Sequence, residues 1–101
     1  MDPERLSDFN ISDVVESTAG RDRGQLFYVI GMDPVFLLLA NGKDRTLDKP
    51  KRKKRKHIKK VLRSETRVAE HLRNGDKVLN SELRRVLAYL SREMQGNNLG
   101  G

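Results

Sequence analysis

Short apolar segments alternate with turn residues through the first half of the chain. Three of these segments are rich in β-branched or aromatic residues, and they are Asp13–Thr18, Gln25–Gly31 and Val35–Ala40. Glycines separate the first two segments. Asp33 and Pro34 interrupt the chain before the third, since proline cannot continue a strand ladder. The pattern therefore predicts short antiparallel strands joined by tight turns.

The dipeptide Asn41-Gly42 follows the third segment directly. Both residue types tolerate positive φ, which a two-residue type I′ hairpin requires. We therefore expect the chain to fold straight back into a fourth strand over Lys43–Leu47. A fifth strand is expected over His57–Leu62, although the apolar spacing of that segment also fits a turn of helix.

Five short strands in this length favour a small, bent barrel, which leaves little open sheet edge. Val35–Ala40 is apolar on both faces, so one face should fill the barrel and the other needs a cover. The C-terminal third offers a short helix capped by Ser64 and ended by Gly75, then a longer helix that begins at Asn80 or Ser81. An apolar stripe follows the longer helix and consists of Leu83, Val86, Leu87, Leu90 and Met94. We expect this stripe to pack on the barrel, with contact to a partner or a second copy as the alternative.

These elements predict a mainly β domain with C-terminal α structure, in which a small antiparallel barrel precedes one short and one longer helix. The length of 101 residues allows one small core and no second one of similar size. The expected divisions are a polar N-terminal tail over 1–10, the barrel over 11–63, a helical extension packed on the barrel over 64–95, and a flexible tail over 96–101.

Several chemistries are disfavoured by what the sequence lacks. There is no cysteine, so neither a disulfide framework nor a cysteine-based metal site is possible. His57 and His71 are far apart and lack partnering acids, so we expect no metal and no cofactor. Asp13, Glu16 and Asp22 are expected to be exposed and are too few for acid–base catalysis. No nucleophile is paired with a base, and we expect no enzymatic activity.

Neither a targeting segment nor a membrane span is evident. The N-terminal stretch "MDPERLSDFN" is acidic and has no apolar core, so it does not resemble a signal peptide. The longest apolar run, Val35–Ala40, is far too short to cross a bilayer. We therefore expect no membrane association, and a cytoplasmic location.

Charge is concentrated in one part of the sequence. The net charge is +7, but the window from Lys43 to Arg63 holds twelve Lys or Arg against Asp44 and Asp48, a net +10. The rest of the chain therefore carries −3. A concentration of this kind is the electrostatic signature of a protein that binds a polyanion.

The run "KPKRKKRKHIKK" at Lys49–Lys60 has three interpretations: a solvated loop, a localisation signal or a phosphate-binding surface. Nucleic acid is favoured because predicted strands flank the run, basic residues continue onto those strands, and a small barrel can bring Arg21 and Arg23 to the same end. The candidate RNA-binding residues are Arg21, Arg23, Lys43, Arg45, Lys49, Lys51, Arg52, Lys53, Lys54, Arg55, Lys56, Lys59 and Lys60. The side chains from Lys51 to Lys54 are expected to be exposed.

Turn residues and aromatics complete the candidate site. Gly20 and Gly24 flank "RDR" and permit the positive φ of a tight turn, while also letting a phosphate approach the backbone. The expected structural turn residues are Gly20, Gly24, Asn41 and Gly42. Phe27 or Tyr28 must face away from the barrel interior if the strand alternates. Packing under the helices is favoured for that aromatic over stacking on a base.

The segment "VVESTAGRDRGQLFYVIG" resembles the KOW motif, with Gly24 at the eleventh position from Val14. The similarity continues through "FLLLANGKDRTLDKPKRKKRKHI", which resembles the KOW-type large-subunit ribosomal proteins of archaea and eukaryotes, especially the fourteen-e type. The length and the "LNSELRRVLAYL" ending are more similar to the small bacterial KOW-domain RNA-binding proteins. The resemblance covers roughly Ile11 to Ile58.

The resemblance implies an SH3-like barrel that binds ribosomal or other structured RNA through basic loops. The expected protein is a non-catalytic RNA-binding module associated with the ribosome, a monomer off the RNA, with rRNA and ribosomal proteins as partners. The alternative is an SH3-like protein-interaction module, as in the KOW domains of transcription factors. In that case the basic run is a localisation or solvated segment.

Overall fold

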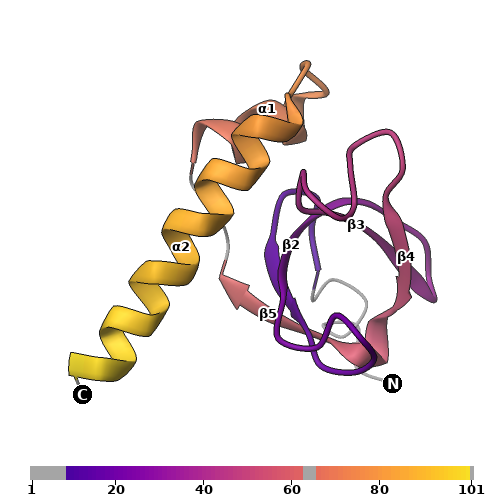
Figure 1. The fold of residues 1–101 in the computed structure, drawn as a ribbon. Helices are drawn as coiled ribbons and strands as arrows, with labels where there is room; N and C mark the ends of the chain where they lie inside the picture. The colour runs from indigo at the N-terminus through magenta and orange to yellow at the C-terminus, as the bar shows by residue number, and fades with distance from the viewer. Residues whose placement is uncertain (1–8, 63–65, 101) are drawn as a thin grey trace.

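The computed structural model of the protein describes residues 9–62 and 66–100 and shows a curved antiparallel sheet followed by two helices (Figure 1). The elements in chain order are β1 (Val14–Ser17), β2 (Leu26–Met32), β3 (Phe36–Ala40), β4 (Lys51–Lys54), the 3₁₀ turn η2 (Arg55–His57), β5 (Ile58–Leu62), α1 (Arg67–Asn74) and α2 (Asn80–Gly100). The strand order is β4-β3-β2-β1-β5. This confirms the expected fold class, a small barrel-like β domain with C-terminal helices.

The sheet is a four-stranded meander that β5 extends at the β1 edge. Each of β1 to β4 pairs with its neighbour in sequence, as three successive connections predict. β5 then pairs along the free edge of β1, with Ser17 opposite Ile58. The β2–β3 turn is held by Asp33, whose carboxylate accepts the backbone N–H groups of Val35 at 2.9 Å and Phe36 at 2.7 Å. The strand expected near His57–Leu62 is confirmed.

Apolar side chains of the sheet form two clusters, and β3 contributes to both, although Leu38 on its outer face is exposed. The barrel interior contains Val15, Phe27, Val29, Leu37, Leu39 and Ile58. The outer face packs under the helices and contributes Val14, Tyr28 and Ala40 to a second cluster, together with Val68, Ala69, Leu83 and Leu87. Phe27 and Tyr28 are therefore both fully buried, one on each face. The packing favoured for the second aromatic is the one observed.

The fourth strand does not lie at Lys43–Leu47, where the Asn41-Gly42 dipeptide predicted it. Gly42 has φ of 77°, but Asn41 is not in the positive-φ region, so no type I′ hairpin forms. The Asn41 side-chain oxygen instead accepts the backbone N–H groups of Lys43 at 2.9 Å and Arg45 at 3.0 Å. This local turn diverts the chain into a loop over 41–50, and the expected strand Lys43–Leu47 is wrong. The ladder with β3 is formed by the basic run itself.

Both helices begin differently from the expected capping. Thr66 caps α1 by accepting the Ala69 N–H at 3.1 Å, whereas the expected cap Ser64 lies outside the described residues. Gly75 ends α1 with φ of 77°, as expected. The side chain of Asn80 does not cap α2. It accepts the backbone N–H of Leu47 at 2.8 Å and so ties the 41–50 loop to the helix.

The apolar stripe of α2 packs on the sheet from Leu83 to Leu90, and Figure 1 shows the helix beside the barrel. Leu83 and Leu87 are buried, and Val86 and Leu90 are half-buried against the same cluster. This part of the stripe is therefore used for packing within the chain. Over residues 9–62 and 66–100, neither helix combines the length and the apolar character that crossing a membrane requires.

Candidate functional site

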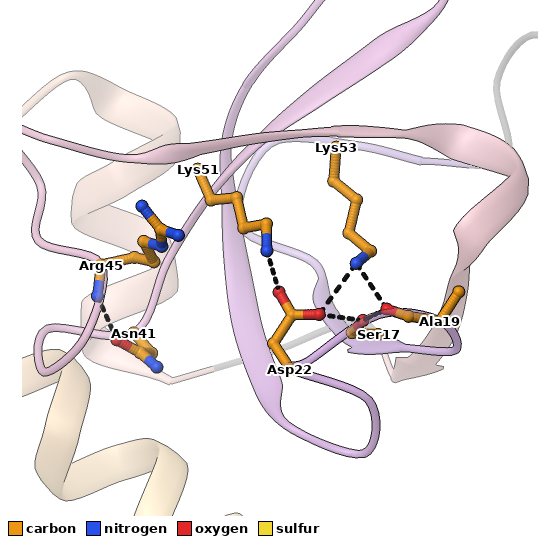
Figure 2. Close-up of polar contacts among 7 residues, drawn as sticks. All are labelled: Ser17, Ala19, Asp22, Asn41, Arg45, Lys51 and Lys53. Carbon is orange, nitrogen blue, oxygen red and sulfur yellow. Dashed lines mark hydrogen bonds and ion pairs between the residues drawn. The ribbon is translucent and has the colours of Figure 1, made fainter.

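A buried ion-pair cluster joins the β1–β2 loop (residues 18–25) to strand β4. Asp22 is only 8% exposed, and its Oδ1 accepts hydrogen bonds from Lys53 Nζ at 2.8 Å and Ser17 Oγ at 2.6 Å. Lys51 Nζ lies 2.7 Å from the other carboxylate oxygen. Lys53 Nζ also donates to the Ala19 carbonyl at 2.7 Å. Figure 2 shows both lysine amines reaching from β4 to this one carboxylate, so the loop is fixed against the strand.

The charge state of Asp22 follows from these contacts. Burial by itself would raise the pKa of Asp22, but the hydrogen bonds from Lys51, Lys53 and Ser17 and the charge of Lys51 outweigh burial and hold the pKa well below its usual range. Asp22 is therefore ionised at neutral pH. The two ammonium groups exceed the single carboxylate by one charge, so the cluster remains cationic.

Two lysines of the basic run are not exposed as expected. Lys53 is buried and Lys51 is half-buried, because alternate side chains of β4 point toward the β1–β2 loop. Asp22, also expected to be exposed, is their partner. Asp13 is likewise buried rather than exposed, and it pairs with Lys60 at 3.4 Å. These lysines support the fold, and a strongly basic stretch of sequence thus contains structural as well as free charges.

A first basic face forms where two loops meet at one end of the barrel. Arg21 from the β1–β2 loop, Arg45 from the β3–β4 loop (residues 41–50) and Lys51 line a hollow of about 240 Å³. Arg21 and Arg45 are exposed, and neither guanidinium makes a hydrogen bond or ion pair to any residue that the structure describes. The structure therefore brings together two arginines that are distant in sequence.

A second basic face lies on the other side of β4. Arg52 stacks over the Phe36 ring, with the guanidinium carbon 3.8 Å from the ring centroid, and lies 3.6 Å from the Asp33 carboxylate. Arg55 donates twice to the Asp33 carbonyl, at 3.1 and 2.9 Å. Lys54, Arg55 and Lys56 border a hollow beside the β2–β3 turn. The run Lys49–Lys60 is therefore divided between faces and does not form one patch.

The other predicted residues take different positions. Arg23, Lys43, Lys49 and Lys59 are exposed, and Lys43 lies near the first basic face. Gly20, Gly24 and Gly42 all have positive φ, in agreement with a role in turns. His57 and His71 take part in no cluster of three or more potential metal ligands within the described part of the chain.

Three residues of the candidate site were not predicted from the sequence. Asp22 looked like a solvated loop residue, and its only signal was its position between the two loop glycines. Phe36 had no part in the predicted site, but it partly reaches the surface and lies under Arg52. Arg84 lies on the polar side of α2 and donates to the Gly42 carbonyl at 2.6 Å, which places a helix residue beside the first basic face. No local pattern in the sequence predicts that contact.

The comparisons with known proteins add no assignment. The chain matches no protein-family model, and no curated protein is significantly similar to it. The geometry of the two basic faces and of the loops that carry them is therefore the basis for a functional conclusion.

Proposed function

We propose that the protein is a non-catalytic RNA-binding module that grips phosphates with its first basic face. The observation that supports this most strongly is the convergence of Arg21 and Arg45 from two different loops on one hollow beside Lys51. The resemblance to KOW-type ribosomal proteins favours rRNA as the target, with association with the ribosome, a cytoplasmic location and a monomeric state off the RNA as parts of the same proposal.

The chemistry of this face suits phosphate. A guanidinium presents donors in a planar fork that matches two phosphate oxygens, and both arginines have this fork available. Bringing several cations to one end of a small barrel destabilises the folded state, and a bound polyanion offsets that repulsion. The Asp22 cluster fixes one of the two loops in advance, which reduces the entropy lost on binding.

RNA is favoured over DNA by two arguments. The cations that converge at the first basic face, Arg21 and Arg45, lie on loops. They are therefore not arranged along a recognition helix of the kind that enters the major groove of DNA. Basic loops on a compact barrel instead suit folded RNA, which proteins recognise largely through its backbone and shape. The KOW resemblance points the same way.

A salt titration of binding to large-subunit rRNA tests the proposal. If about five phosphates are engaged, the slope of log affinity against log salt should be roughly −3.5 to −4.5. The double variant Arg21→Gln, Arg45→Gln should weaken binding at low salt and make the slope shallower by about 1.5. The matched control is Arg85→Gln, Arg92→Gln, which removes the same charge from exposed positions on α2.

Circular dichroism should show that all these variants remain folded, because the four arginines are exposed. Lys51 and Lys53 are left unchanged because they hold the β1–β2 loop in place. A folded double variant with the affinity and salt slope of the parent would overturn phosphate binding at this face.

A second candidate function is a protein-interaction module, and one observation favours it. Val35 is 54% exposed and Leu38 is 36% exposed, and Leu38 pairs opposite Arg52 on the second basic face. An apolar surface bordered by cations fits an acidic protein partner. In that case binding from a ribonuclease-treated extract should persist, and it should be lost in Val35→Ser, Leu38→Ser but not in Arg21→Gln, Arg45→Gln.

A further inference from the structure

A groove lies between α2 and the loop end of the barrel, next to the first basic face. Its volume is about 680 Å³, within the range of roughly 300–1,000 Å³ that is usual for small-ligand sites. Its wall on the barrel side comes from the β1–β2 and β3–β4 loops, and its other wall comes from α2. Gln25 and Asp44 line both this groove and the hollow that holds Arg21 and Arg45. The two depressions therefore form one continuous surface.

The floor and the rim of the groove differ in chemistry. Leu26, Leu87 and Ala88 provide apolar surface, while Lys43 and Arg84 place positive charge at the edges. Arg84 is held in position by its hydrogen bond to the Gly42 carbonyl at 2.6 Å. Apolar surface beside cations suits a ligand that is apolar at one end and anionic at the other, such as a nucleotide.

The shared border between the two depressions is polar but not cationic. Gln25 and Asp44 are exposed, and their side chains form no hydrogen bond or ion pair within residues 9–62 and 66–100. A carboxylate repels phosphate, so Asp44 opposes binding if the ligand places only phosphates there. A carboxylate is instead a good acceptor for the exocyclic amino group of a base, as in its pairing with cytosine N4.

We propose that this groove binds an unpaired nucleotide of the RNA, with its base on the apolar floor and its amino group donating to Asp44. The phosphate on one side of that nucleotide then lies at the Arg21–Arg45 hollow, and the phosphate on the other side lies by Lys43 and Arg84. This inference rests on the proposed RNA-binding function and specifies its ligand: a base with an exocyclic amino group, at a single-stranded position that adjoins structured RNA.

The experiment uses the full chain and three RNAs built on one duplex: blunt-ended, with a short cytidine overhang, and with a uridine overhang of equal length. Cytosine carries the amino donor at the position where uracil carries an acceptor oxygen. The protein should bind the cytidine overhang about fivefold more tightly than the uridine overhang, the scale of one base-edge contact. Both overhangs should bind more tightly than the blunt duplex.

Variants at two positions separate the chemistry from simple electrostatics. Asp44→Asn adds one positive charge to the net charge, yet it should weaken cytidine binding and strengthen uridine binding, because an amide can donate to the uracil oxygen. The control Asp76→Asn makes the same charge change at an exposed site outside the groove and should leave the ratio unchanged. Ala88→Phe fills the groove from an exposed helix position and should remove the advantage of the overhangs, whereas Ala88→Ser should retain it.

The following results would contradict one or both proposals. Equal binding of all three RNAs, with Arg21→Gln, Arg45→Gln still weakening them, overturns the groove and leaves the proposed function standing. Tighter binding of every RNA by Asp44→Asn also overturns the groove, since Asp44 then acts only as a repelling charge. Failure to bind any RNA at low salt overturns both proposals. Preference for an acidic peptide over the overhang RNAs, measured in competition, likewise overturns the nucleotide as the occupant.

Discussion

The two loops that carry the candidate site are held in place by different kinds of interaction. The β1–β2 loop is fixed by a buried carboxylate, Asp22, which is shared by two lysines of β4. The β3–β4 loop is fixed by hydrogen bonds to the side chains of Asn41 and Asn80, by the hydrogen bond from Arg84 to the Gly42 carbonyl, and by the close approach of Gly42 to α2. The first loop depends on a buried ion pair, and the second depends on close packing and on hydrogen bonds.

The difference matters because each loop presents one arginine of the same hollow. Arg21 depends on the ion-pair cluster, whereas Arg45 depends on the Asn41 turn and on the docking of α2. Acid should therefore disturb one half of the site before the other. Substitutions in the two loops should also respond differently to pH, and the following variants test that contrast.

The largest loss of stability is expected from Asp22→Ala. Removing the carboxylate leaves the buried Lys53 ammonium without its charged partner, and breaking a buried pair in this way costs about 3–5 kcal/mol. Asp44→Ala changes an exposed aspartate of the other loop and should cost less than about 0.5 kcal/mol. Urea unfolding measures both values. Similar values for the two variants would mean that Asp22 contributes no more than a solvated charge.

The next largest effect is expected from Gly42→Ala. Its φ of 77° strains an L side chain, and an added Cβ would overlap the backbone carbonyl oxygen of Asn80. Together these effects should cost roughly 2–3 kcal/mol. Gly24→Ala has a similar φ of 89° but open space around it, so it should cost only about 1 kcal/mol. Thermal unfolding of the pair should show the larger fall in Tm for Gly42→Ala.

A smaller effect should follow acidification. The pKa of Asp22 in the folded protein lies below its unfolded value of about 3.9, so its stabilisation is fully present above that pH. The stabilisation is lost as the pH falls from there toward the folded pKa. The stability gap between the parent and Asp22→Asn should therefore narrow in acid, in urea titrations at a series of pH values.

Asn41→Ala supplies the contrast for the acid experiment, because an amide does not titrate and its stability gap should stay constant. A gap for Asp22→Asn that is equally constant would contradict the charge-based account of the β1–β2 loop.

The smallest effect is expected from Asn80→Ala. It removes the acceptor for the Leu47 backbone N–H and should cost about 1 kcal/mol, the usual contribution of one hydrogen bond. Amide exchange should report faster exchange at Leu47, with the β1–β2 loop unaffected. Faster exchange in both loops would show that they are coupled rather than held independently.

Much of the fold could be predicted from the sequence pattern, because the burial of apolar side chains determines where the strands lie. Three predicted strands match β1, β2 and β3 within a few residues, because apolar strands are stable only where their side chains are buried. These segments are Asp13–Thr18, Gln25–Gly31 and Val35–Ala40. β4 was missed because its Lys and Arg side chains give no hydrophobic period. Its place in the sheet is set by pairing with β3 and by the partner that its lysines find in Asp22.

The candidate site was predictable only as a set of charges. Sequence reasoning placed Arg21, Arg45 and Lys53 in one candidate set, but Arg21 and Arg45 are exposed whereas Lys53 is buried. Which charge is free depends on the direction of each side chain and on contacts between residues far apart in sequence. The contact of Lys53 with Asp22 spans 31 positions, and no local pattern encodes such a pairing.

The pairing of β5 with β1 has a consequence for the order of events during synthesis. β1 is an inner strand of the finished sheet, but its outer edge has no partner until the segment from Ile58 onward has been made. At ordinary rates of translation this leaves an apolar strand edge exposed for seconds, while β2 and β3 are already available to pair. Asp13 directly precedes β1, and in the finished fold it pairs with Lys60 of β5, so it places a charge at that edge. Charges near an open edge are a common means of discouraging association with other chains until the ladder is complete.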